Sequence, residues 1–232
     1  MIILAIDTSG QSGGITLAEA EETSFRVIES TPIAGGTFSA QLIPTLAALL
    51  SKHGFVAKDI GGFAAASGPG SFTGLRVGLS AIKGLAETLH KPIATVSVLE
   101  ALASLADGTG KIAAALDAGR KEVFLGVYEG ADGKNNSASR MVHEELLSQS
   151  ELQAAIAEQK PILIVTSDTV IAELAAPSQI TVKQVSRPGG DIIARLGARK
   201  LLAGETVSVE ALDANYLRRS DAEIFFKGTS SK

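Results

Sequence analysis

IILAIDTSG, residues 2–10, and IAAALDAGR, residues 112–120, are the two stretches that decide the fold. Each is an apolar run that predicts a buried strand, ends at an aspartate (Asp7 or Asp117) and leads through a turn into a second strand. Either aspartate alone is more typical of an ordinary turn. Because the same layout recurs about half a chain length later, we expect a duplicated domain with a cleft between the two copies.

Outward from the first copy, apolar periodicity and turn residues predict the element order βββαβαβα. The expected strands cover residues 1–6, 15–20, 24–30, 61–67 and 92–96, and the expected helices cover residues 38–52, 71–89 and 97–106. In the second half we expect strands within residues 111–130, a polar loop at 131–139, a strand and a helix within 161–174, and an amphipathic helix over 189–205. The sequence predicts an α/β protein with one lobe over residues 1–106 and another over 107–232, whose last helices can pack back on the first lobe.

Composition limits the classes of function. With 45% hydrophobic residues, 4% aromatic residues and 24 glycines, the core must consist of Ala, Leu, Ile and Val at close backbone approaches. The formal net charge of −4 gives no basic field to hold nucleic acid, so we expect any RNA contact to need a partner. The absence of cysteine excludes disulfides and suits a reducing cytosol. No apolar run is long enough for a membrane span and no leader is recognised, so we expect a cytoplasmic protein.

The glycine-proline turn SGPGSFTG, residues 67–74, lies between an expected strand and an expected helix, where anions can bind. It lacks the lysine of a phosphate-binding P-loop. Gly68, Gly70 and Gly74 are spaced one residue too widely for the dinucleotide fingerprint, and Pro69 removes an N–H donor. We therefore favour a tight turn that starts the helix, with Ser71 or Thr73 as its N-cap.

The helix expected at 72–89 carries an apolar arc too wide for contact with one sheet. It also carries glycines at positions 74, 78 and 84, which are unfavourable in a helix unless another segment approaches closely. Two explanations stand equally: burial within its own lobe, or an oligomer interface. The histidines at positions 53, 90 and 143 are isolated and match no metal-binding spacing.

Five segments together resemble one family across nearly the whole chain: ILAIDTS, SGPGSFTGLRVGLSAIKGLA, PIATVSVLEALA, LDAGRKEVFLGVY and ANYLRRSDA. They are similar to the TsaB (YeaZ) family, whose members serve bacterial tRNA N6-threonylcarbamoyladenosine formation. The resemblance implies an actin-like (ASKHA) fold of two RNase-H-like lobes with mixed sheets flanked by helices. It also implies a subunit that is not an enzyme alone and that pairs with and activates the catalytic paralogue TsaD.

The same resemblance implies further partners: a TsaE-like ATPase, a second copy of the chain when unpaired, and tRNA only through the complex. No cofactor is expected on this chain alone, whereas ATP or ADP and metal are expected on the partner subunits. In the family the paired surface is built from first-lobe helices. Carried onto this chain, it comprises Phe38, Gln41, Leu42, Thr45, Phe72, Thr73, Arg76, Val77, Ser80, Lys83 and Gly84. The turn that sets the second of these helices comprises Gly68, Pro69, Gly70 and Gly74.

The chain departs from the pattern of the catalytic paralogue at one decisive place. That pattern has an H-x-x-x-H metal-binding pair, and Val98 and Leu102 stand at its two positions here. Phe38 also replaces a histidine common in the family. Asp7, Thr8 and Asp117 mark a possible vestigial nucleotide cleft. Two other interpretations stay open: a free-standing ASKHA small-molecule kinase that uses both aspartates, and an M22-type peptidase.

Overall fold

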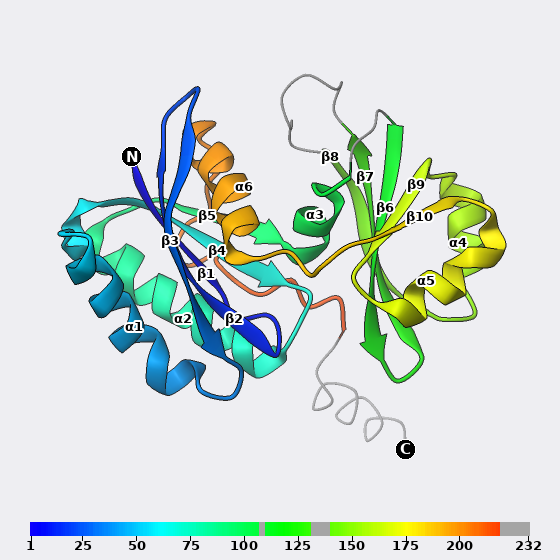
Figure 1. Ribbon diagram of the computed structural model, residues 1–232, viewed down its shortest axis with the longest axis horizontal. Helices are drawn as coiled ribbons and strands as arrows, with labels where there is room; N and C mark the ends of the chain where they lie inside the picture. The colour runs from blue at the N-terminus through cyan, green and yellow to red at the C-terminus, as the bar shows by residue number, and fades with distance from the viewer. Residues whose placement is uncertain (107–109, 131–139, 219–232) are drawn as a thin grey trace, which may run out of the picture.

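The computed structural model describes residues 1–106, 110–130 and 140–218, which form two lobes side by side (Figure 1). The first lobe is built on a five-stranded sheet in the order β3-β2-β1-β4-β5. Its strands are β1 (Ile2–Asp7), β2 (Ser12–Ala20), β3 (Phe25–Ala34), β4 (Ile60–Gly68) and β5 (Ile93–Ser97). Strand β2 runs antiparallel to both β1 and β3, whereas β4 runs parallel to both β1 and β5.

The second lobe repeats this plan. Its sheet has the order β10-β9-β6-β7-β8, and its strands are β6 (Gly110–Gly119), β7 (Glu122–Gly130), β8 (Arg140–Ser148), β9 (Leu163–Thr166) and β10 (Thr181–Gln184). The central strand β6 is antiparallel to β7 and parallel to β9, as β1 is antiparallel to β2 and parallel to β4 in the first lobe. The duplication expected from the two aspartate-ended strands is confirmed.

The helices show the same repetition. In the first half α1 (Phe38–Lys52) precedes β4, α2 (Phe72–Leu89) precedes β5, and α3 (Val98–Ala103) follows β5. In the second half α4 (Leu152–Gln159), α5 (Thr169–Ala175) and α6 (Gly190–Leu202) hold the equivalent places. Short 3₁₀ turns occur at Ala57–Asp59 and Ala176–Ser178. Both halves therefore read βββαβαβα, as predicted for the first half.

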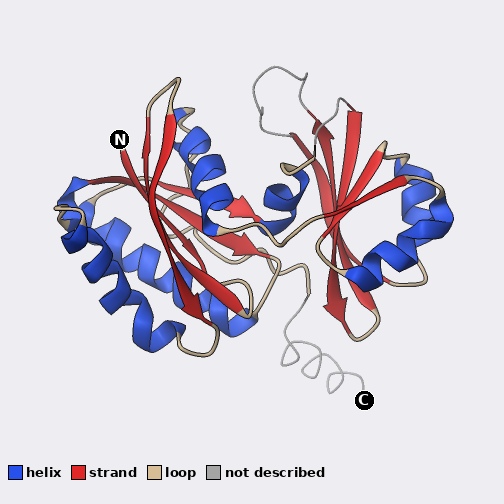
Figure 2. Ribbon diagram, in the orientation of Figure 1, coloured by secondary structure: helices blue, strands red, loops and turns tan. Residues whose placement is uncertain are grey.

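The helices that cover each sheet come from both halves of the chain. Helices α1 and α2 cover the outer face of the first sheet, and α4 and α5 cover the outer face of the second (Figures 1 and 2). Between the sheets, α6 packs on strands β1, β2, β4 and β5 of the first lobe, whereas α3 packs on β6 and β7 of the second. Each half thus contributes its last helix to the other half's sheet.

The layer between the two sheets is rich in alanine, which allows close packing. Ala5, Ala64, Ala94 and Ala194 are all 1% exposed or less there. A β-carbon on Gly197 of α6 would lie 2.2 Å from the β-carbon of Ala64 on β4, so this crossing requires glycine. The core of small residues at close backbone approaches, expected from composition, is confirmed.

A polar pair joins the two exchanged helices within this layer. Lys200 of α6 donates from Nζ to Glu100 Oε2 of α3 at 2.7 Å and to the carbonyl oxygen of Thr95 at 2.9 Å. Both side chains are largely buried, so the charges neutralise one another in a place that water reaches poorly.

After α6 the chain returns across both lobes as a strap, residues 205–218, with little regular structure. Val207 makes an isolated antiparallel bridge to Ile93 at the edge of the first sheet. Further on, the Asn215 backbone N–H donates to the carbonyl oxygen of Ser67 at 2.7 Å, and its side-chain amide donates to Glu144 of β8. The strap therefore ties the end of β4 to the second lobe.

Sequence reasoning did not identify β8, α4 and β10. Strand β8 lies at the edge of its sheet and mixes charged and apolar residues without alternation, α4 has 8 residues, and β10 has 4 and also lies at an edge. Such short or half-exposed elements leave a weak periodic signal. None of the helices in the described ranges is both long and apolar enough to cross a membrane.

Candidate partner-binding surface and interlobe cavity

The glycine-proline turn positions α2 by packing against the turn that follows β1. The Ser71 backbone N–H donates to the carbonyl oxygen of Ser9 at 2.7 Å, and the Ser71 hydroxyl accepts from the Gly74 N–H at 3.2 Å as the N-cap of α2. A β-carbon on Gly70 would lie 2.2 Å from the Ser9 carbonyl oxygen. The turn is thus filled by the chain's own backbone, and the N-cap predicted at Ser71 or Thr73 is Ser71.

The glycines of α2 fall into two groups, which separates the two explanations left open by the sequence. Gly74 and Gly78 are buried, and β-carbons there would lie 2.1 Å from the Thr8 carbonyl oxygen and 2.3 Å from Thr8 Oγ1. Gly84 is exposed, and a β-carbon there would meet no atom within 4 Å. Burial within the lobe therefore explains the first two glycines, and the third lies on the open face of the helix.

A groove of about 510 Å³ runs between α1 and α2 on the outer face of the first lobe. Phe38 and Leu42 are 5% and 2% exposed, so both side chains belong to the core and form the floor of the groove. Ile43, which is 52% exposed, stands on its rim, and nothing in the sequence pattern had singled it out. The lining residues are Phe38, Ser39, Leu42, Ile43, Phe72, Thr73, Arg76, Val77, Ser80 and Ala81.

Most of the other residues carried onto this surface lie where a partner can reach them. The exposed ones are Gln41, Phe72, Thr73, Arg76, Ser80 and Gly84, and the half-buried ones are Thr45, Val77 and Lys83. Burial of Phe38 beneath the groove means that its ring supports α1, because Gly13 leaves room for it beside β2.

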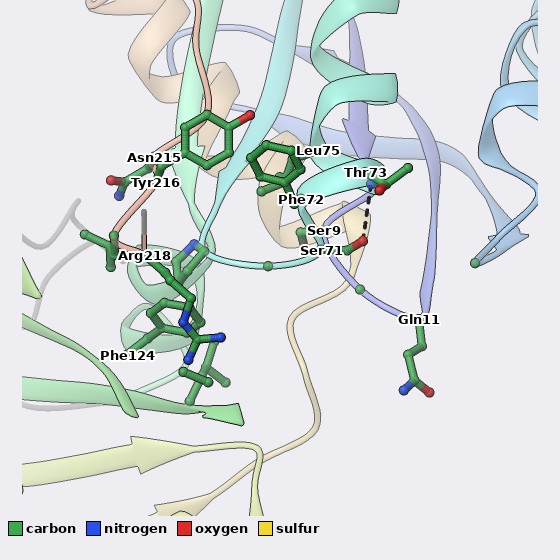
Figure 3. Close-up of a pocket in the computed structure, with 18 of the residues that line it drawn as sticks. Ser9, Gln11, Ser71, Phe72, Thr73, Leu75, Phe124, Asn215, Tyr216 and Arg218 are labelled. Atoms are coloured by element: carbon green, nitrogen blue, oxygen red, sulfur yellow. Dashed lines mark hydrogen bonds between the residues drawn. The ribbon is translucent and has the colours of Figure 1, made fainter. Parts of the chain in front are cut away.

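A larger cavity of about 1140 Å³ opens between the lobes and shares the N-terminal end of α2 with the groove (Figure 3). The turn residues Pro69, Gly70 and Gly74 line it from the first lobe, and Asp117 and Arg120 line it from the second. Arg187, on the connection from β10 to α6, also lines it and donates to Ser9 Oγ at 3.2 Å. The cavity is therefore an interlobe space with both acidic and basic groups on its walls.

The three residues of the possible nucleotide cleft are placed differently. Asp7 and Thr8 are 6% and 2% exposed and lie behind the cavity wall, whereas Asp117 is exposed and lines it. Asp7 Oδ1 accepts the Ser9 N–H at 2.8 Å, and Asp117 Oδ1 accepts the Gly119 N–H at 2.9 Å. Each aspartate thus closes the same type of turn in its own lobe.

Phe72, Arg76 and Tyr216 form a cluster where the groove meets the cavity, and Figure 3 shows the Phe72 and Tyr216 rings beside each other. The ring centroids of Phe72 and Tyr216 are 5.0 Å apart. The Arg76 guanidinium carbon lies 3.8 Å from the Phe72 ring centroid, and Arg76 Nε donates to the Tyr216 hydroxyl at 3.1 Å. Tyr216 lies on the strap, where no periodic pattern could have revealed it.

The strap is held to the second lobe by Arg218 and by Asn215, whose acceptor Glu144 also accepts from the buried Tyr128 of β7. Arg218 pairs with Glu122, and its guanidinium carbon lies 5.9 Å from the Phe124 ring centroid. Tyr128 is fully buried and donates its hydroxyl to Glu144, and burial together with this carboxylate raises the pKa of Tyr128 above its ordinary value. Arg219, whose role the sequence left open, lies outside the described residues.

The histidines occupy separate places. His53 and Lys52, at the end of α1, share Glu29 of β3, and this pairing lowers the pKa of the Glu29 carboxyl. His143 pairs with Glu145 on β8, and His90 is the C-cap of α2. Val98 and Leu102, the positions that the resemblance aligns with the metal-binding pair of the catalytic pattern, lie on α3 and are 2% and 0% exposed in the layer between the sheets.

The model of the TsaD family, described as tRNA N6-adenosine threonylcarbamoyltransferase, matches residues 32–224. The tRNA threonylcarbamoyladenosine biosynthesis protein TsaB of Bacillus subtilis (strain 168) is 30% identical over 233 residues, and the match covers 96% of each chain. The chain belongs to the TsaB family. The protein of the same name from Escherichia coli (strain K12) is 26% identical over 96% of each chain.

Solved structures agree with membership of the TsaB family. A crystal structure from Pseudomonas aeruginosa, described as an uncharacterized protein with similarity to peptidase YEAZ, matches with a TM-score of 0.74 and 27% identity. The match covers 94% of this chain and 99% of that one. The expected actin-like α/β fold of two lobes with mixed five-stranded sheets is confirmed.

Proposed function

We propose that this chain is the non-catalytic partner subunit in formation of N6-threonylcarbamoyladenosine in tRNA, at the adenosine 3′ of the anticodon. Relatives named as tRNA threonylcarbamoyladenosine biosynthesis proteins, matching over 96% of the chain, support a role in that pathway. In this proposal the chain pairs with a TsaD-like catalytic paralogue and holds it in a competent form. Reaction takes place on the paralogue.

One observation carries the non-catalytic assignment. Val98 and Leu102 occupy the positions at which the catalytic pattern has its two metal-binding histidines, and both are packed among apolar residues between the lobes. Aliphatic side chains have no lone pair to donate to a metal ion. The Asp7 carboxylate is also engaged with the backbone of its own turn and lies behind the cavity wall. This geometry argues against a peptidase or a kinase that would use these positions.

The α1–α2 face is the proposed pairing surface. It combines an apolar groove with exposed Phe72 and Arg76, residue types that are enriched at protein interfaces. The exposed Gly84 lets another helix approach α2 closely. A TsaE-like ATPase joins the pair, self-association uses the same face when the paralogue is absent, and tRNA is met through the complex.

The proposal assigns no cofactor to this chain alone. ATP or ADP and metal belong to the partner subunits, and the assembly works in the cytoplasm. A formal net charge of −4 supports a division of labour in which other subunits hold the tRNA backbone.

Reconstituted tRNA modification tests the proposal. The mixture contains the catalytic paralogue, the accessory ATPase, the enzyme that supplies threonylcarbamoyl-adenylate, and tRNA. We expect modification to require the native chain. Gly84→Arg should fold but abolish pairing and modification, because its side chain fills the space that a partner helix occupies. Gly84→Ala is the matched control and should retain both activities.

Two results would overturn the proposal. If modification proceeds equally well without this chain, it is not a required subunit. If the folded Gly84→Arg variant pairs and supports modification as the native chain does, the assignment of the α1–α2 face is wrong. Phosphorylation of a small molecule by the isolated chain with ATP would replace the proposal with a kinase function.

A further inference from the structure

Arg76 is held in one orientation by two contacts within its own chain. Its guanidinium stacks on the Phe72 ring, with 3.8 Å between the guanidinium carbon and the ring centroid. Its Nε donates to the Tyr216 hydroxyl at 3.1 Å, and the Tyr216 ring packs against Phe72 in turn. A flexible side chain thereby loses much of its rotamer freedom before any partner arrives, which lowers the entropy cost of binding.

The terminal nitrogens of Arg76 have no acidic partner among the residues that the structure describes. In those ranges its contacts are the two rings and the Tyr216 hydroxyl, and the side chain is exposed. An exposed guanidinium with both terminal nitrogens available is the geometry that receives a carboxylate or phosphate through two parallel hydrogen bonds.

We propose that Arg76 is the receptor for one carboxylate of the catalytic paralogue, and that Phe72 and Tyr216 are positioning residues for it. The inference rests on the proposed function and specifies the chemistry of its partner: an apolar face that fills the α1–α2 groove and carries one Asp or Glu beside α2. On this account the interface extends from the helices onto the strap, because Tyr216 belongs to residues 205–218.

The surroundings of Arg76 favour a protein carboxylate over a phosphate. The adjoining groove is lined mainly by apolar side chains, which suit an apolar protein surface, and the hydroxyls of Ser39, Thr73 and Ser80 are its other polar groups beside Arg76. Nucleic-acid binding relies on many cations acting together. Arg76 is the charged residue among those that line the groove, and the chain as a whole carries a formal net charge of −4.

The same lining favours a different protein over a second copy. None of the residues that line the groove is acidic. A two-fold self-pair through this face brings the same groove lining from both copies together, so that lining supplies Arg76 with no carboxylate. The α1–α2 face therefore suits a partner that carries an acidic residue opposite Arg76.

The affinity of the native chain and its variants for the isolated paralogue provides the test. We expect Arg76→Gln to weaken pairing by about tenfold or more, as loss of one member of a hydrogen-bonded charge pair at an interface does. Arg76→Lys should also weaken it, because lysine keeps the charge but not the two-pronged geometry. Tyr216→Phe should weaken pairing less than Arg76→Gln does. In a chain that already carries Tyr216→Phe, Arg76→Lys should lower the affinity by a smaller factor than it does in the native chain. Lys58→Gln, which removes an exposed charge outside the groove, is the control and should have no effect.

Double-mutant cycles with Arg76 identify the acidic residue of the paralogue that pairs with it. Each Asp and Glu on the paralogue's first-lobe helices is changed to its amide, and one of them should lose its effect on affinity when Arg76 is already Gln. Thermal unfolding of each variant confirms that it is folded. Affinity of the isolated chain for tRNA is measured in parallel.

Each alternative gives a distinct result. If Arg76→Gln pairs as tightly as the native chain, or no acid of the paralogue couples to it, the inference fails while the proposed function stands. If Arg76→Gln lowers tRNA affinity or self-association but not pairing, a phosphate or a second copy is the occupant and the inference fails. If the native chain does not pair with the paralogue, the proposed function fails first.

Discussion

A β-carbon on Gly78 would lie 2.3 Å from Thr8 Oγ1, so the middle of α2 is in direct contact with the residue that follows β1. Gly78→Ala should therefore lower the free energy of unfolding by about 1–3 kcal/mol, because an added methyl must displace Thr8. Gly84→Ala should instead raise it by up to about 1 kcal/mol, because the site is open and alanine favours helix. Urea unfolding of both variants checks the contrast, and equal effects would contradict this packing of α2.

The pair between α3 and α6 should contribute more to stability than an exposed pair of the same length. Lys200→Met leaves the buried Glu100 carboxylate and the Thr95 carbonyl without this donor, and we expect a loss of about 2–4 kcal/mol. Arg26 and Glu19 also approach to 2.7 Å but are exposed, so Arg26→Met should cost less than about 1 kcal/mol. Chemical denaturation measures both. Similar losses would mean that water reaches Lys200 as freely as it reaches Arg26.

Tyr128 should make the fold sensitive to alkali. Burial and the Glu144 carboxylate raise the pKa of Tyr128 above 10.0, so the folded chain keeps a proton that the unfolded chain releases. Stability is therefore full below about pH 10 and falls as pH rises beyond it. The chain has two tyrosines and no tryptophan, so Tyr128 is the remaining tyrosine in a Tyr216→Phe variant. Tyrosinate absorbance should then appear together with loss of the circular dichroism signal. Its appearance in the folded state would show that Tyr128 ionises in place.

Ser71 should stabilise α2 through its hydroxyl. Ser71→Ala removes the acceptor for the Gly74 N–H, and we expect a loss of about 1 kcal/mol of unfolding free energy. Ser71→Asp should recover most of this loss, because aspartate also accepts at an N-cap and its charge suits a helix N-terminus. Thermal unfolding of the two variants tests the cap, and an unchanged midpoint in Ser71→Ala would contradict it.

Sequence patterns predicted the first half of the fold well, because its strands are long apolar runs and its helices are amphipathic or capped by Ser and Gly. They also predicted the duplication, from Asp7 and Asp117. Edge strand β8 and the short β10 escaped notice because half-exposed elements lack a regular period.

The candidate site was predicted less completely than the fold. The α1–α2 face followed from resemblance, and two of the residues assigned to it, Phe38 and Leu42, lie beneath the surface. Tyr216 was missed because the strap owes its path to single contacts with Phe72, Arg76 and Ser67, distant in sequence. No local property of the residues around it encodes those contacts.

The exchange of α3 and α6 has a consequence for how the chain is made. Synthesis of the first sheet is complete once Ser97 has been added, but the helix that covers its inner face begins at Gly190. An alanine-lined sheet face must therefore wait through the synthesis of nearly the entire second lobe before its cover emerges from the ribosome. The first sheet therefore cannot reach its complete packing until residues 190–202 have been synthesised.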